Sequence, residues 1–444
     1  MRRVCLTITG LIIGILAANS QNSAFVPRSQ NAPVDTPGFK SRTLKIDEVN
    51  ILSSYYWQTA DKSAVSGGDP GPRGIGNVTD LSNGIELKLV GWDPKGRKNS
   101  LTGGIGMDNH TAASQAYVDS SGRGKRTGTR IYPTVDWTIE NEQRGTSFGI
   151  GAYYSAEHNY YHSIGLNTSF SAKTKHNGEF SAKLTGYFDH IVMIRPSELI
   201  PIDSSGISTG STTDSVVYIT TASGRTEAIS YNTGQVLSKG NRVQIPSSSR
   251  DSYSASFSFT QVINQRMQGA ILVDLAYQTG YLGLPFHRVY FADSSTAVVE
   301  KLPSQRLKLP VGLRLNYFLG DRIILRGYYR FYIDNWGVRS HTASLEVPIK
   351  VTPFFSISPF YRYYIQSAST YFAPYKVHTP ADEYYTSNYA LSAFSGQYFG
   401  TGIRLAPPGG IGNGHLSMIE IRYGHYTETT NLVSNLIGLN LTFK

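Results

Sequence analysis

The sequence predicts an all-β protein: a single transmembrane antiparallel β-barrel of about 16 strands, with short periplasmic turns and long extracellular loops. Three observations predict this class. Apolar and polar side chains alternate in segments of roughly 11 to 15 residues, long enough to cross a bilayer as tilted strands. The connections between the segments alternate between short and long. Charged residues make up only 16% of the chain, whereas Tyr (30) and Gly (44) are abundant, which is typical of membrane strands with aromatic girdles.

The first residues have the three parts of a secretory signal peptide. Two arginines are followed by an apolar run and by a small-x-small cleavage site at 18–20. We therefore predict a signal peptide over 1–20, with a retained N-terminal anchor helix as the alternative. The single cysteine, Cys5, falls inside this segment, so we expect the exported chain to contain no disulfide.

The next stretch, 21–44, is polar and contains three prolines, and we interpret it as a flexible periplasmic lead-in. No later segment approaches the roughly 18 consecutive apolar residues that a membrane-spanning helix requires. If 45–444 lies in a membrane, it therefore crosses it with strands. We predict one barrel domain over this range.

The alternating segments are the predicted strands of this barrel. In chain order they are 48–59, 83–93, 100–109, 129–140, 146–157, 161–173, 178–190, 252–263, 267–279, 307–318, 322–334, 338–350, 354–366, 391–405, 415–427 and 431–443.

The connections separate into two sets by parity. The short set is 94–99, 141–145, 174–177, 264–266, 319–321, 351–353 and 406–414. Every long connection falls in the other set, which is 60–82, 110–128, 158–160, 191–251, 280–306, 335–337, 367–390 and 428–430. Tight turns on one side and long loops on the other are typical of outer-membrane barrels. A soluble sandwich, the alternative all-β fold, has no physical reason to sort its loops in this way.

The stretch "LRGYYRFYIDNW" at 325–336 shows the two faces of one strand. Leu325, Tyr329 and Phe331 fall on one face, and Arg326 and Arg330 on the other. Because successive side chains of a strand point to opposite faces, we expect lipid against the first set and a hydrated lumen against the second. In this register no charged residue occupies a mid-strand lipid-facing position, where Lys or Arg would cost about 2–4 kcal/mol.

Several charged residues are predicted to line the lumen together. The arginines of this predicted stripe are Arg314, Arg326, Arg330, Arg362, Arg404 and Arg422, and acids on the same face include Asp274, Asp334, Glu346 and Glu420. One interpretation is a constriction that attracts anions, and the other is a set of salt bridges within the wall. In either case an arginine stripe biases a water-filled pore toward anions.

The longest connection, 191–251, is rich in Ser, Thr and Gly and is interpreted as a long extracellular loop. It is a candidate plug or lid, and its segment "SVVYITT" is a candidate extra hairpin above the membrane. A mobile surface loop is the alternative.

The sequence contains no recognised catalytic or metal-binding motif. GxSxG, HExxH and Walker patterns are absent, and the Gly-rich "GDPGPRGIGN" precedes no helix. Of the 10 histidines, His341 and His425 fall on the predicted lipid face near the outer ends of their strands. We therefore predict neither an enzyme nor a cofactor or metal. A net charge of +10 without a long basic run also predicts no nucleic-acid partner.

Three segments carry a resemblance to a known family. They are "QTGYLGLPFHRVYF" (278–291), "GYYRFYIDNWGVRSHT" (327–342) and "PFYRYYIQSASTYF" (359–372). With them the chain resembles, over roughly 45–444, the outer-membrane barrel family of Gram-negative bacteria catalogued as domain of unknown function family 3570. The resemblance implies an outer-membrane location and a single barrel, and it implies no catalytic residues.

The run Pro285, Phe286, His287 and Arg288 is distinctive within this resemblance. It lies in a long outer connection that should otherwise tolerate change. We hypothesise that this loop folds inward onto the arginine stripe and narrows the pore.

The first hypothesis on function is a porin-like or transport channel in outer-membrane lipid that passes small polar, possibly anionic, solutes. One alternative is a non-conducting structural or assembly barrel that partners a periplasmic or surface complex. A second alternative is an outer-membrane lipid-acting hydrolase. The sequence leaves the solute and a possible homo-oligomer open.

Overall fold

The computed structural model describes residues 41–60, 77–111, 127–157, 161–192, 214–220, 226–232, 247–284, 287–293, 297–412 and 414–444. The predicted signal peptide and nearly all of the predicted lead-in lie outside these residues. Strand β1 begins at Arg42, three residues before the predicted start of the barrel.

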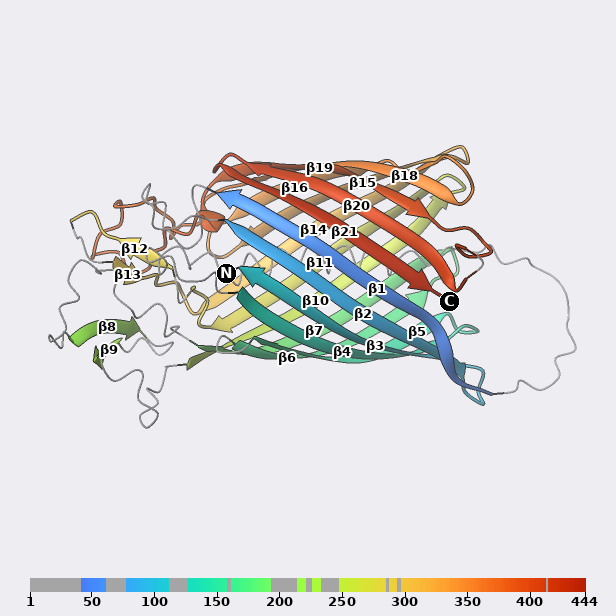
Figure 1. The fold of residues 1–444 in the computed structure, drawn as a ribbon, viewed down its shortest axis with the longest axis horizontal. Coiled ribbons are helices and arrows are strands. Elements are labelled where there is room, and N and C mark those ends of the chain that lie inside the picture. Colours follow the sequence, from blue (N-terminus) through green and yellow to red (C-terminus); the bar gives the residue numbers. More distant parts are fainter. Residues whose placement is uncertain are drawn as a thin grey trace, which may run out of the picture.

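The strands that form the wall follow one another in chain order (Figure 1). They are β1 (Arg42–Ala60), β2 (Val78–Trp92), β3 (Lys98–Thr111), β4 (Thr127–Asn141), β5 (Thr146–Glu157), β6 (Tyr161–Lys173), β7 (Gly178–Val192), β10 (Ser247–Asn264), β11 (Met267–Gly280), β14 (Gln305–Leu319), β15 (Ile323–Asp334), β16 (Arg339–Glu346), β17 (Ile349–Lys350), β18 (Phe355–Gln366), β19 (Phe394–Leu405), β20 (Leu416–Glu428) and β21 (Leu432–Phe443).

The wall closes on itself, which confirms the predicted barrel. Each strand pairs antiparallel with its neighbours in the chain, and β1 pairs with β21, so that Val49 lies opposite Phe443. β16 and β17 share one position, because both lie between β15 and β18. The 17 strands of the sheet thus occupy sixteen positions. Closure leaves no unpaired sheet edge, as a strand-built membrane protein requires.

The two ends of the barrel differ as the connections predict. The short turns and the C-terminal residue lie at one end, called here the short-turn end, and the long connections lie at the other, the long-loop end (Figure 1). Two small hairpins lie beyond the long-loop end: β12 (Arg288–Tyr290) with β13 (Ala297–Val299), and β8 (Asp214–Thr220) with β9 (Thr226–Asn232). The second confirms a hairpin at the "SVVYITT" segment.

The outer face of the barrel is apolar along its whole circumference. On β14, Leu307, Leu309, Leu313 and Leu315 are exposed by 40–52%, while the residues between them turn to the inner side, called here the lumen face. Such exposure of large apolar side chains suits contact with lipid, because a soluble surface rarely carries so large an apolar area. Among the described residues, no helix is both long and apolar enough to cross a bilayer.

Two predicted strands differ from the observed ones for local reasons. The predicted strand 338–350 is split into β16 and β17, because Pro348 has no N–H to donate to the ladder. The predicted strand 391–405 begins at Phe394, because a 3₁₀ turn, η4 (Tyr389–Leu391), precedes it and is capped by the Asn388 side chain. Several other strands extend beyond the predicted ends into segments without alternation, since strand pairing continues where lipid no longer selects the side chains.

The buried apolar cluster of the described residues lies at the long-loop end and not in the lumen. It consists of Leu282, Trp336, Val338 and Leu391, with Leu302, Tyr332, Tyr371 and Phe372 packed against it. These residues come from the connections 281–304, 335–338 and 367–393 and from the end of β15. The three connections therefore pack together as one folded cap over the β14–β19 side of the wall.

Tyrosine rings on the lumen face lie over glycines of the neighbouring strand. Tyr187 on β7 is directly opposite Gly165 on β6, and a Cβ at that glycine would lie 2.6 Å from the ring. Tyr187 also packs edge-to-face on Tyr153, with ring centroids 5.7 Å apart. The same arrangement recurs at Gly106 under Tyr132, Gly312 under Tyr328, Gly396 under Tyr426 and Gly424 under Tyr398. This pairing of a bare backbone with a flat ring gives a packing reason for these five glycines and the tyrosines over them.

Replacing Gly165 should therefore destabilise the barrel. Gly165→Ala places a methyl group against Tyr187 and 3.1 Å from Tyr153, and overpacking of this kind costs about 1–3 kcal/mol. The measurement is the urea midpoint of unfolding from lipid vesicles. The matched control is Gly438→Ala on β21, where a Cβ meets nothing within 4 Å. Equal midpoints for the two variants would contradict the packing argument.

Candidate channel lumen

The structure places all the predicted arginines and acids at positions that alternate with exposed apolar residues, and thus on the lumen face. They lie on β11 (Asp274), β14 (Arg314), β15 (Arg326, Arg330, Asp334), β16 (Glu346), β18 (Arg362), β19 (Arg404) and β20 (Glu420, Arg422). Their contacts divide the lumen wall into a long-loop zone, a middle zone and a short-turn zone.

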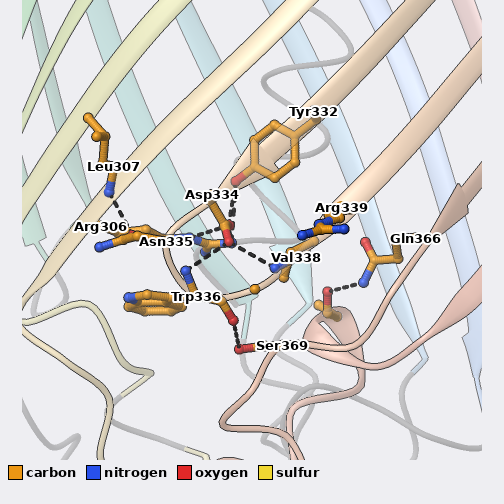
Figure 2. Close-up of polar contacts among 12 residues, drawn as sticks. Arg306, Leu307, Tyr332, Asp334, Asn335, Trp336, Val338, Arg339, Gln366 and Ser369 are labelled. Carbon is orange, nitrogen blue, oxygen red and sulfur yellow. Dashed lines mark hydrogen bonds and ion pairs between the residues drawn. The ribbon is translucent and has the colours of Figure 1, made fainter.

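Asp334 organises the long-loop zone on one side of the barrel. Its carboxylate, with a side chain 0% exposed, accepts hydrogen bonds from Arg306 Nε at 2.8 Å and Tyr332 Oη at 2.7 Å. It also accepts the backbone N–H groups of Trp336 and Val338, each at 3.0 Å. Figure 2 shows these contacts converging at the turn between β15 and β16. Asp334 thereby fixes the turn that carries Trp336 into the buried cluster.

The partner of Asp334 was not among the predicted lumen residues. Arg306 lies just before the predicted strand 307–318, and in the structure β14 begins at Gln305. Its guanidinium also stacks over the Trp336 ring, with the centroid 4.4 Å from Cζ. Asp334 is thus paired in the wall, and it does not neutralise an arginine of the predicted stripe.

Further ion pairs of the same kind line the long-loop zone on the β3–β10 side. Arg130 Nη2 pairs with Asp108, which also accepts a hydrogen bond from Tyr132 Oη at 2.9 Å. Arg250 Nε donates to Asp189 at 2.8 Å, across the β7–β10 junction. Within each of these buried pairs the two charges compensate each other, which offsets the cost of burying them.

A repeated sequence pattern also marks the long-loop zone. A tyrosine hydroxyl donates to an acidic or amide side chain two residues later on the same face, at 2.6–2.7 Å. The pairs are Tyr56–Gln58, Tyr332–Asp334, Tyr364–Gln366 and Tyr426–Glu428. The pattern Tyr-x-(Asp/Glu/Gln) is visible in the sequence, but the alternation of apolar and polar residues does not single it out.

In the short-turn zone, two arginines share two acids. Arg422 Nη1 lies 3.2 Å from Glu346 Oε1 and 3.4 Å from Glu420 Oε1. Arg326 Nη1 lies 3.9 Å from the same Glu346 oxygen. In this zone, therefore, Arg326 and Arg422 form salt bridges within the wall, which is the second of the two interpretations of the predicted stripe. Arg404 lies nearer the short-turn end, opposite Ser356 and Glu420 in the strand register, and is exposed.

The middle zone differs, because two of its arginines, Arg330 and Arg362, have no acidic partner among the described residues. Among the described residues, no carboxylate lies within ion-pair distance of Arg330 or Arg362. The Arg362 guanidinium instead lies over the Tyr398 ring, 5.7 Å from the centroid, and Arg314 lies over Tyr328 at 6.0 Å. In the middle zone the charges of Arg330 and Arg362 are thus not compensated by a carboxylate of the described residues.

Asp274 and the proposed constriction loop take no part in the contacts described for these zones. Asp274 is on β11 opposite Ser256. His287 is fully buried at the long-loop end, where its backbone N–H donates to the Leu284 carbonyl at 3.1 Å, and Arg288 begins β12. Pro285 and Phe286 lie outside the described residues. The hypothesis that this loop narrows the pore stays a prediction.

The connection 367–393 is fastened by a histidine and two acids. His378 Nδ1 lies 3.1 Å from Asp382 Oδ2, and its Nε2 lies within 3.2 Å of the Thr386 backbone. Thr386 Oγ1 in turn donates to the buried Glu300, which joins this connection to 281–304. The hydrogen bond from the Thr379 N–H and that from the His378 ring hold the pKa of Asp382 below its ordinary value.

The lowered pKa of Asp382 predicts how the stability of the connection 367–393 depends on pH. A carboxyl group whose pKa is lower in the folded protein stabilises it above its unfolded pKa of about 3.9, and this contribution disappears as pH falls through the folded pKa. Asp382→Ala should therefore raise the rate of proteolytic cleavage within 367–393 at pH 7, and should raise it by a smaller factor at pH 2, where pepsin is the protease. Glu383→Ala is the neighbouring control. A variant-to-native ratio that is the same at both pH values would contradict the assignment.

Two histidines on the outer face, His341 and His425, hydrogen-bond a tyrosine hydroxyl and an amide oxygen. His341 Nδ1 lies 2.7 Å from Tyr329 Oη, and His425 Nδ1 lies 2.8 Å from Asn435 Oδ1. Within the described contacts, neither ring hydrogen-bonds a serine or threonine hydroxyl. The pairing of a serine or threonine hydroxyl with a histidine base is therefore not formed at these two rings, and the hydroxyl that His341 contacts belongs to Tyr329.

Fold and lumen together define a β-barrel of the outer-membrane type. The chain belongs to the protein family of unknown function DUF3570, which it matches over residues 104–434. No curated protein matches the chain.

Solved barrels resemble it at low identity. Pseudomonas aeruginosa OccK1 (OpdK) is 7% identical with a TM-score of 0.39, covering 89% of this chain and 97% of that one. A double variant of OccD1 (OprD) is 9% identical with a TM-score of 0.38, covering 89% and 95%. A variant of the ferric enterobactin receptor PfeA from Pseudomonas aeruginosa is 9% identical with a TM-score of 0.42, covering 85% of this chain. The chain spans about half of that receptor, 53% of its length.

Proposed function

We propose that the protein is a non-enzymatic outer-membrane channel that passes small polar solutes and favours anions over cations. The observation that carries the proposal is the pair Arg330 and Arg362, whose charges no carboxylate of the described residues neutralises. A barrel of sixteen strands is wide enough for an aqueous lumen. Inside low-dielectric walls, uncompensated positive charge raises the local concentration of anions.

The location is part of the proposal and has separate support. The predicted signal peptide at 1–20 implies export, and the apolar outer face suits contact with outer-membrane lipid. Solute is expected to cross between the two ends of the lumen without a cofactor. The compensated pairs of the other two zones hold the wall in shape, and the middle zone is left to select by charge.

The test is the reversal potential of the purified protein in a planar bilayer under a KCl gradient. The native channel should show the sign of a chloride preference, and the double variant Arg330→Gln/Arg362→Gln should reduce it toward zero. Lys183→Gln, a single charge change on the lumen face of β7 outside the stripe, should have the smaller effect. A native barrel that passes no current would reject the channel in favour of a structural or assembly barrel, and a potassium preference would reject the anion selectivity.

A further inference from the structure

The middle zone contains a compact group of hydrogen-bond donors. Arg330 on β15 lies directly opposite Thr342 on β16, which lies opposite Tyr364 on β18. One step toward the short-turn end, Arg362 on β18 lies opposite Ser344, which lies opposite Tyr328. Opposed side chains on neighbouring strands have Cβ atoms about 4.5–5.5 Å apart. The three strands thus present two guanidinium groups and a threonine hydroxyl within one lumen-facing patch that contains no acid.

Two atoms of this patch are buried and have no hydrogen-bond partner. They are Nε of Arg330 and Oγ1 of Thr342, which belong to directly opposed residues. Thr342 itself is only 6% exposed. Leaving a buried donor unsatisfied is costly, and native structures rarely tolerate it without a reason. Two such atoms on directly opposed residues therefore indicate a place for an acceptor that is not part of the chain.

The neighbouring acids are engaged and leave the patch without a counter-charge. Glu346 is held by Arg422, Asp334 by Arg306, and Glu428 accepts from the hydroxyls of Tyr426 and Thr430 at 2.7 Å. The positive charges of Arg330 and Arg362 also act on each other unfavourably. A single anion between the two guanidinium groups would relieve this repulsion and satisfy the unpartnered donors together.

We propose that Arg330, Thr342 and Arg362 form a binding subsite for an oxyanion group, a carboxylate or a phosphate, within the lumen. The inference rests on the proposed function in that the solute reaches the patch through the lumen. The planar fork of a guanidinium donates two parallel hydrogen bonds to an oxyanion, which a spherical chloride cannot accept in the same way. The hydroxyl of Thr342 adds a third donor group, next to Arg330 in the strand register. The subsite therefore distinguishes an oxyanion from chloride by geometry as well as by charge.

The test is calorimetric titration of the detergent-solubilised full-length barrel with inorganic phosphate and, separately, with acetate. Both titrations use Tris chloride at constant ionic strength. The variants are Arg330→Gln/Arg362→Gln and Thr342→Val, which removes the hydroxyl and keeps shape and charge. Lys183→Gln is the control for a charge lost elsewhere on the lumen face. Each variant is run on a denaturing gel with and without boiling. An unboiled sample that migrates faster than the boiled one shows that the variant was folded.

The native barrel should bind one or both oxyanions. The double variant should lose affinity by at least about tenfold and Thr342→Val by several-fold, because each removes hydrogen bonds to a charged group. Binding of phosphate alone supports a subsite for a phosphate group, and binding of acetate alone supports a subsite for a carboxylate. Native-like binding in the double variant, or an equal loss in Lys183→Gln, overturns it. A barrel that conducts without binding rejects the subsite alone, and one that binds without conducting rejects the channel alone.

Discussion

Asp334→Ala should be the most destabilising single substitution on the lumen face. It removes the carboxylate that holds Arg306, Tyr332 and the N–H groups of Trp336 and Val338. Removing one partner of a buried ion pair costs about 3–5 kcal/mol, because the other charge stays buried and uncompensated. Trp336, 1% exposed in the native protein, should become hydrated. The measurement is unfolding by urea in lipid vesicles, with a red shift of the tryptophan fluorescence.

Two comparisons isolate the cause of this effect. Glu346→Ala removes a lumen carboxylate that is a quarter exposed, with a side-chain relative exposure of 25%, and it should cost clearly less, since such pairs are partly screened by water. Arg306→Ala/Asp334→Ala should be less destabilised than the sum of its two single variants, because the pair is coupled. Additive effects of the two single substitutions would show that Asp334 does not act through Arg306.

The second large effect is expected on the outer face. Leu313 on β14 is exposed by 52% and lies in the middle of its strand, where lipid is expected. Leu313→Lys should destabilise the barrel by about 2–4 kcal/mol, because a lysine at the bilayer midplane loses its hydration. The measurement is again the free energy of unfolding from vesicles, with the folded fraction after reconstitution as a second readout.

Ser256→Lys is the matched control for Leu313→Lys. Ser256 is a lumen-face residue of β10 that lies opposite Asp274 on β11 and Lys183 on β7, so an added lysine meets water and one charge of each sign. Its cost should stay within about 0.5 kcal/mol, as for other solvated positions. If both lysines were equally tolerated, the outer face would not contact lipid and the membrane assignment would fail.

The barrel was predictable because lipid and water select side chains at every second position. On β15, Leu325, Tyr329 and Phe331 alternate with Arg326 and Arg330, and this period of two reports the backbone geometry directly. The parity of the connection lengths then predicts closure and the placement of the two ends. Local chemistry explains the errors: Pro348 splits a predicted strand, and Asn388 caps a 3₁₀ turn where a strand was expected.

The grouping of the lumen charges was not predictable from the same pattern. Alternation places Arg326, Arg330 and Arg362 on the lumen face, but it does not say which acids they meet. That depends on the register between strands, which brings Glu346 opposite Arg326 and leaves Thr342 opposite Arg330. The cap depends on contacts between residues far apart in the chain, such as Thr386 with Glu300. Such contacts leave no periodic signal in the sequence.

Successive side chains of β15 are expected to face lipid and the water-filled lumen in turn. Cysteine labelling tests this expectation most directly. The only cysteine of the chain, Cys5, lies in the predicted signal peptide and is replaced by serine. Single cysteines are then placed at Leu325, Arg326, Tyr329 and Arg330 in the reconstituted barrel and exposed to a charged, membrane-impermeant maleimide. Cysteines at 326 and 330 should react and those at 325 and 329 should stay protected. Uniform reaction at all four positions, or the reverse pattern, would contradict the account.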